Sequence, residues 1–208
     1  MGLFTILVTN LFKINKMKIT EEKINLNFVR FIKMLKKYAL YTDELDKDDQ
    51  FNDLLKLAPS HTKDETGGAY NGGLIEHILL VTDYAKKLNE NLLKEDERVD
   101  NKSLMKVCFL HQISKAKEYR VNDVEWEIKK GNFYKFNDGL PALKTGEYSA
   151  YLCSQYGIEL TEDEYEAILS IDKEDDVQTK LFGNMLSRIL RVANEFANVE
   201  RKKNFIKK

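Results

Sequence analysis

Two histidines, His77 and His111, are the residues of this chain best suited to metal chemistry. Each lies in an expected helix, one turn from apolar positions. An imidazole can bind a divalent ion, but such a site normally needs several converging ligands, including carboxylates that neutralise the cation. The residue after His111 is an amide, Gln112, which is a weaker and uncharged ligand. A histidine on an apolar helix face is, by default, a hydrogen-bonded core residue, and the sequence leaves both interpretations open.

A glycine-rich turn leads into the helix that carries His77. It spans residues 67–73 and includes the pair Gly72 and Gly73. The backbone N–H groups of that pair could receive an anion at the helix N-terminus, where the helix dipole favours negative charge. The alternative is a tight turn that needs a positive φ, which glycine adopts without strain.

Apolar residues recur at spacings of three and four along most of the chain, which predicts a mainly α fold. Expected helices cover about residues 20–39, 51–57, 74–93, 102–116, 146–156, 161–171 and 177–199. Between about 124 and 136 the period changes to two, with Trp126 alternating with charged residues ahead of a turn. This segment predicts a small β-hairpin inserted in an otherwise helical chain. Its aromatic side chains either stack on a base or pack one face of the hairpin on the body.

The composition is that of one helix-rich globular domain. The chain has 208 residues, 43% of them hydrophobic and 32% charged, with only 2 prolines, so it can bury one core of ordinary size. We expect residues 1–16 to be a weakly ordered N-terminal extension, residues 17–200 to form the domain and residues 201–208 to be a basic C-terminal tail. The extension is apolar but too short to span a bilayer.

Charge and cysteine content limit the partners and the compartment. The formal net charge is −1, so no overall field favours nucleic acid or an anionic membrane. The two cysteines, Cys108 and Cys153, form no CxxC pair, which excludes a zinc ribbon and favours a reducing compartment. We therefore expect a cytoplasmic protein without a membrane partner.

The order of these segments resembles the HD superfamily of metal-dependent phosphohydrolases, especially the short HD proteins of bacteria and their phages. Members show a Gly-Gly-Leu-x-x-His helix start, matched by residues 72–77, and an apolar helix ending in His-Asp-x-x-Lys, against which this chain has residues 111–115. An aromatic hairpin and a Gly-His-Gly-Glu-x-Ser segment follow in the family, and residues 126–136 and 144–149 are similar. The resemblance covers about residues 20–200 and implies an HD-like helical bundle.

The resemblance also implies a metal site, and this chain departs from it at most of the ligand positions. The family's first histidine is kept as His77, and the histidine of its His-Asp pair is kept as His111. The aspartate of that pair, two further histidines and a closing aspartate are replaced by Gln112, Thr145, Ile171 and Asn194. A one-residue slip would offer Asp172 in place of Ile171. Amides are weak ligands that leave the charge of a divalent ion uncompensated, so this pattern predicts loss of hydrolysis.

From this pattern we expect a pseudoenzyme that binds a nucleotide or another phosphate ligand without cleaving it, in the host cytoplasm if a phage encodes the chain. Its expected ligand-binding residues are Gly72, Gly73, His77, His111 and Lys115. The family counterpart of Lys115 faces phosphate, and the alternative is an exposed helix lysine.

Two other functions stay open. One is a structural module that uses the HD fold as a scaffold for a protein partner. The other is a residual phosphohydrolase that holds a weakly bound divalent metal on His77 and His111, with Asp172 or Glu147 as substitute ligands. Apart from such a weakly held metal, we expect no cofactor.

Overall fold

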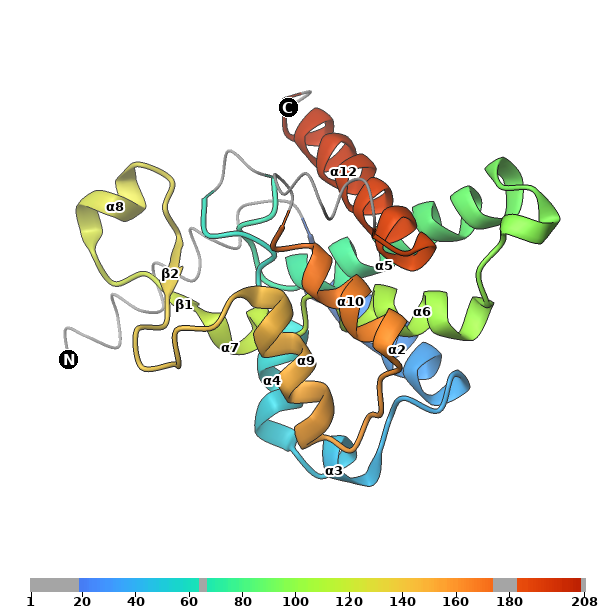
Figure 1. Ribbon diagram of the computed structural model, residues 1–208. Helices are drawn as coiled ribbons and strands as arrows, with labels where there is room; N and C mark the ends of the chain where they lie inside the picture. The colour runs from blue at the N-terminus through green and yellow to red at the C-terminus, as the bar shows by residue number, and fades with distance from the viewer. Residues whose placement is uncertain (1–18, 64–66, 174–182, 207–208) are drawn as a thin grey trace.

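Polar residues cap several helices in the computed structural model, which describes residues 19–63, 67–173 and 183–206 (Figure 1). The Thr20 side chain accepts a hydrogen bond from the third N–H group of α2 (Glu21–Lys37). At α10 (Glu162–Ser170), Thr161 and Glu164 each accept from the other's backbone N–H and form a capping box. These side chains satisfy N–H groups that a helix leaves without an internal partner.

The described chain is mainly helical, with one small antiparallel sheet. Its other elements, in chain order, are α3 (Asp43–Asp46), α4 (Asp49–Leu57), α5 (Gly73–Lys87), the π-helical turn η2 (Leu88–Leu92), the 3-10 turn η3 (Glu95–Glu97), α6 (Asn101–Leu110), α7 (Lys115–Glu118), β1 (Tyr119–Val121), α8 (Glu125–Lys129), β2 (Tyr134–Phe136), α9 (Thr145–Gln155) and α12 (Met185–Ile206).

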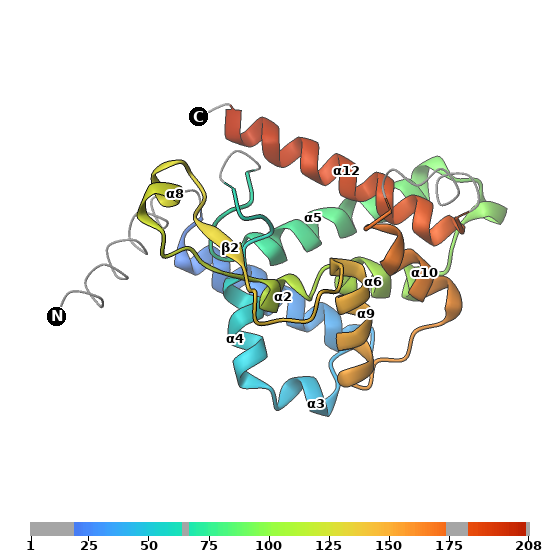
Figure 2. The same ribbon diagram turned by 60° about the vertical axis from the view of Figure 1, so that its left-hand side comes forward.

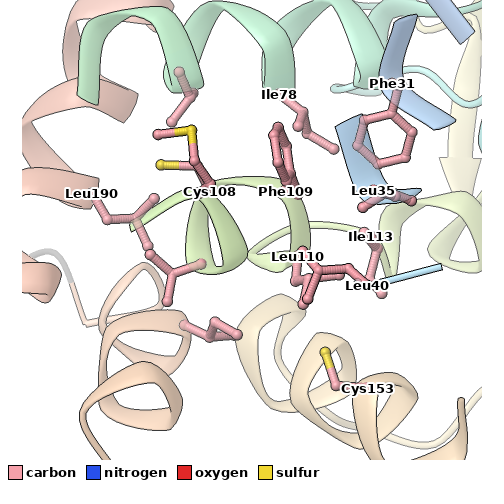
Figure 3. Close-up of a cluster of buried hydrophobic side chains, with 14 of the residues drawn as sticks. Phe31, Leu35, Leu40, Ile78, Cys108, Phe109, Leu110, Ile113, Cys153 and Leu190 are labelled. Carbon is pink, nitrogen blue, oxygen red and sulfur yellow. The ribbon is translucent and has the colours of Figure 1, made fainter. Parts of the chain in front are cut away.

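Helices α5, α6 and α12 enclose the apolar core together with α2 and α10. The α12 helix runs beside α5 in both views, whereas α3, α4 and α9 lie on the opposite side of α6 (Figures 1 and 2). Ile78, Phe109 and Leu190, from α5, α6 and α12, meet in this core (Figure 3). Phe31 packs edge to face on Phe109, with ring centroids 6.0 Å apart. Because each of these helices buries an apolar stripe in one core, their relative positions are fixed by packing.

The β-hairpin predicted over 124–136 is wrong in its pairing. Strand β1 pairs antiparallel with β2, with Tyr119 opposite Phe136, and α8 fills the connection between them. Lys129 and Glu125 form an ion pair of 2.8 Å one helical turn apart, and Trp126 is 57% exposed. The alternation of apolar and charged residues therefore marks a short solvated helix. The aromatic residues of the segment 124–136 do not share one face, because Trp126 of α8 is exposed and Tyr134 of β2 is buried.

The helix predicted over 102–116 ends earlier than expected. Helix α6 stops at Leu110, residues 111–114 form a turn, and α7 begins at Lys115. His111 closes α6, since its N–H still donates to the carbonyl of Val107 at 3.0 Å. The turn breaks the helical register, so the direction of Lys115 relative to His111 does not follow from a spacing of 3.6 residues.

The C-terminal boundary predicted at residue 200 falls inside a helix. Helix α12 continues to Ile206, and Arg201 is buried rather than part of a solvated tail. Residues 1–16 and the start predicted for the last helix, at 177, lie outside the described residues. None of the helices in the described part of the chain combines the length and apolarity needed to cross a bilayer.

Candidate functional site

His77 and Asn194 join α5 to α12 at the centre of the predicted site. His77 Nε2 donates a hydrogen bond of 2.8 Å to Asn194 Oδ1, and both side chains are buried. Asn194 follows the buried Leu190 and Leu186 at spacings of four and eight, which places it on the core-facing side of α12, and it is buried there. A buried amide needs only neutral hydrogen-bond partners, whereas a buried carboxylate would need a compensating charge. The imidazole and the amide therefore satisfy each other directly.

His111 lies in the turn after α6, with its ring centroid 6.2 Å from that of His77. Its Nδ1 donates to the carbonyl oxygen of Cys108 at 2.8 Å. This bond places the proton on Nδ1 and leaves Nε2 with a lone pair. Nε2 of His111 and Nδ1 of His77 are buried without a hydrogen-bond partner among the described residues. Both rings present one basic nitrogen to the protein interior.

Burial favours the neutral form of all three histidines in the chain. It lowers the pKa of His111 to about 4 and that of His61 to about 3, and it holds the pKa of His77 well below its usual value. The positive charges of Lys115 and Arg201 lower the pKa of His77 and of His61 further. At neutral pH these imidazoles therefore contribute no charge, while two cations lie close to them.

Lys115 is a buried cation of the site, only 6% exposed. Its ammonium donates hydrogen bonds of 3.0 Å to the carbonyl of Ser60 and 3.0 Å to Oε1 of Gln112. The alternative of an exposed helix lysine is therefore wrong. The amide oxygen of Gln112 accepts a hydrogen bond from this ammonium, at the position where the HD resemblance implies a metal-binding aspartate.

A pocket of about 280 Å³ lies beside Lys115, and we call it the lysine pocket. It is lined by His61, Gln112, Lys115, Thr145, Ile171, Asp172, Asn194 and Asn198. Four of the six positions that the HD resemblance assigns to metal ligands, the exchanged ones, thus meet in one cavity. They come from the turn after α6, the start of α9, the end of α10 and α12. The two retained histidines do not line it.

Arg201 closes the site from α12 and was missed in the sequence, where it begins the basic tail. Its guanidinium donates to the hydroxyl of Ser60 and, at 2.7 Å, to Oδ1 of Asn198. Burial lowers its pKa to about 10, so it stays charged at neutral pH. A Cβ at Gly68 would lie 2.6 Å from the guanidinium and 2.1 Å from the Ser60 hydroxyl. Gly68 therefore makes room for the arginine, and the adjacent glycines are the sequence signal for this close approach.

The N–H groups of Gly72 and Gly73 are not free to bind an anion, so the expectation that this helix start receives an anion is wrong. Gly72 N–H donates to the carbonyl of Leu57 at 3.2 Å, and Gly73 N–H donates to that of Tyr70 at 3.0 Å. Gly72 has a φ of +78° as the residue before α5. The alternative, a tight turn that needs a positive φ, is therefore confirmed at Gly72. The two N–H groups stabilise this turn and its contact with the end of α4.

Thr145 and Asp172 also line the lysine pocket. Thr145 Oγ1 donates to the buried carboxylate of Glu118 at 2.9 Å. The carboxylate of Asp172 accepts from the Gly146 N–H at 2.6 Å, and its pKa is raised, mainly by burial. Glu147, the other proposed substitute ligand, is exposed and accepts from the Lys144 N–H at the start of α9. Of the two substitutes, only Asp172 faces the pocket.

The residues present do not fit the divalent ion that the HD resemblance implies. The oxygen of Asn194 accepts from His77, and that of Gln112 accepts from the ammonium of Lys115. The nearby charges of Lys115 and Arg201 would repel a cation, and no carboxylate takes the place of Gln112 or Asn194. Within residues 19–63, 67–173 and 183–206, no three His, Cys, Asp or Glu side chains are arranged to hold a metal.

No family model, curated protein or solved structure matches this chain.

Proposed function

We propose that this protein is a catalytically degenerate HD-type protein that binds the phosphate group of a small molecule, such as a nucleotide, without hydrolysing it. The buried ammonium of Lys115 in the wall of the lysine pocket is the observation that carries the proposal. A charged amine in a partly desolvated cavity attracts an anion far more strongly than the same amine in water.

The neighbours of Lys115 support an anion at this end of the pocket. Gln112 and Asn194 are neutral, and the imidazole of His61 is neutral because burial lowers its pKa to about 3. Arg201 adds a second positive charge close enough to lower the pKa of both His61 and His77. Amide N–H groups of Gln112, Asn194 and Asn198 can supply neutral hydrogen bonds to phosphate oxygens.

Absence of hydrolysis follows from the same residues. Attack on a phosphate at neutral pH requires an activated water, which HD enzymes obtain from a metal held by carboxylates and imidazoles. Here the corresponding amides are engaged by His77 and Lys115. A bound phosphate would therefore meet cations and amides. Among the described residues that line the lysine pocket, Asp172 supplies the single carboxylate that could activate a nucleophile.

Thermal-shift titration with inorganic phosphate and adenosine monophosphate tests this proposal. We expect saturable stabilisation of the wild-type protein and its loss in Lys115→Met, which removes the charge and keeps most of the side-chain volume. The matched control is Lys33→Met on α2, where the lysine is exposed and far in sequence from the pocket. An equal response in wild type and Lys115→Met, or no response to either ligand, would contradict phosphate binding. Release of phosphate from the nucleotide would contradict the loss of catalysis.

A scaffold for a protein partner is the second candidate, favoured by one face of α12. Val192, Phe196 and Val199 recur at spacings of four and three, and each is between 39% and 49% exposed. Exposed apolar residues in one stripe are a common feature of interaction surfaces. Phe196→Glu should abolish capture of a partner under this alternative and leave the phosphate response unchanged.

A further inference from the structure

A second pocket, of about 410 Å³, adjoins the lysine pocket. Thr145 and Asp172 line both cavities. The second cavity also contains the carboxylate of Glu118, so we call it the acidic pocket. A ligand whose phosphate sits beside Lys115 would have to extend past Thr145 and Asp172 to enter it. The charges along that path therefore decide which chemical groups of the ligand can follow the first phosphate.

Two carboxylates mark the passage between the cavities. Glu118 is only 8% exposed and accepts hydrogen bonds from Thr145 Oγ1 and Ser114 Oγ. Asp172 accepts from the Gly146 N–H, at the start of α9. Lys144 also lines the acidic pocket, but its side chain is exposed, so water screens its charge. The passage is therefore a region of net negative charge directly beside a cationic one.

The rest of the acidic pocket is largely apolar. Six apolar or aromatic residues from β2, from the segment between β2 and α9, and from α9 line it: Phe136, Leu140, Pro141, Ala142, Leu143 and Tyr148. Such a wall suits an uncharged body with apolar faces. Carboxylate oxygens beside it can accept hydrogen bonds from hydroxyl or amino groups on that body.

From this juxtaposition we propose that the site selects a phosphomonoester of a hydroxyl- or amino-bearing organic body, and excludes diphosphates. Asp172 is the specificity-determining residue. This inference rests on the proposed function, because it takes phosphate at Lys115 as given. A second phosphate would lie against the carboxylates of Asp172 and Glu118, where like charges repel in a partly desolvated space.

Calorimetric titration of the full chain with adenosine monophosphate and adenosine diphosphate, in the absence of divalent metal, tests the inference. Wild type should bind the monophosphate about tenfold or more tightly than the diphosphate, since one unscreened like-charge contact is of that size. Inorganic phosphate and pyrophosphate should show the same order. In Asp172→Asn the preference should shrink to about twofold, because the amide removes the charge and still accepts from Gly146 N–H.

Glu147→Gln is the matched control. It removes one negative charge from the start of α9, the helix start that Asp172 also contacts. Glu147 is exposed, however, and lines neither pocket. It should keep the wild-type preference. Equal or tighter binding of the diphosphate by wild type would overturn the inference alone, as would an unchanged preference in a folded Asp172→Asn. Failure of every phosphate compound to bind would overturn the proposed function and the inference together.

Discussion

At the scale of single residues, the site is a set of polar groups that hydrogen-bond to one another and to the backbone, while Nδ1 of His77 and Nε2 of His111 have no partner among the described residues. His77 donates to Asn194, His111 donates to the carbonyl of Cys108, and Lys115 donates to Gln112. Each of these hydrogen bonds joins two neutral groups, or one charged group and one neutral group, so none leaves a negative charge for a divalent ion to compensate. Gln112 and Asn194 therefore belong to a buried network of neutral and singly charged hydrogen bonds.

Acid should destabilise the protein through its buried histidines. His111 has a pKa of about 4 in the folded protein against 6.5 in the unfolded chain, so the unfolded state takes up the proton first as the pH falls. The free energy of unfolding is then highest above about pH 6.5 and falls by about 3 kcal/mol toward pH 4 for this residue alone. Urea unfolding across that range measures the slope.

His111→Asn isolates this contribution from the titration of carboxylates. Its amide can still donate to the carbonyl of Cys108, but it does not titrate. We expect a shallower dependence of the free energy of unfolding on pH than in wild type. An identical slope in the two proteins would show that His111 does not have a lowered pKa in the fold.

At the scale of elements, polar contacts fix helices that the apolar core brings together. Lys106 of α6 and Glu164 of α10 form an ion pair of 2.7 Å, with their side chains 14% and 2% exposed. The same carboxylate completes the capping box at the start of α10. Since α10 ends at the wall of the lysine pocket, this pair helps to set the position of Asp172 relative to Lys115.

Removal of one partner of this ion pair should be costly. Glu164→Ala leaves the Lys106 ammonium partly buried without its carboxylate and should lower the free energy of unfolding by about 3 kcal/mol. Thr161→Ala removes only the side-chain cap and should cost about 1 kcal/mol. Chemical denaturation of both variants gives the comparison. Equal losses would mean that the ion pair adds nothing beyond the cap.

At the scale of the whole molecule, packing of apolar side chains holds the fold. The buried cluster includes residues from α2, α4, α5, α6, α9, α10 and α12, so one core connects the elements that surround the lysine pocket. Arg201 ties the C-terminal part of α12 to the loop after α4 through Ser60. These contacts are formed by side chains and backbone, so we expect the fold to hold without a bound metal.

A chelator should therefore leave the melting temperature of the purified protein unchanged, and added Mn²⁺ or Zn²⁺ should not raise it. A ligand that binds only the folded state raises the melting temperature by mass action, so the assay detects specific metal binding directly. The double variant Gln112→Asp, Asn194→Asp restores two carboxylates beside the retained histidines and should respond to Mn²⁺. Stoichiometric metal in the wild-type protein that is lost in His111→Ala would contradict this expectation and favour the alternative of a residual phosphohydrolase.

The sequence by itself determined the mainly helical fold and the approximate extent of most helices, and it predicted neutral residues where the HD resemblance implies metal ligands. Periodicity carries this information because it reports which face of a local element is buried. It also placed Asn194 toward the core, as found. It failed at Trp126, where alternation with charged residues belongs to a short solvated helix, since periods over a few residues do not distinguish the two structures.

Only the tertiary structure decided which partners these residues have. The turn at 111–114 aims Lys115 at the carbonyl of Ser60, and α12 brings Arg201 from the supposed tail to the hydroxyl of the same serine. Hydrogen bonds over such sequence separations depend on packing between elements, which no local pattern encodes. The sequence thus predicted a site without its metal ligands, and the packing brought together the buried cations on which the proposed anion site depends.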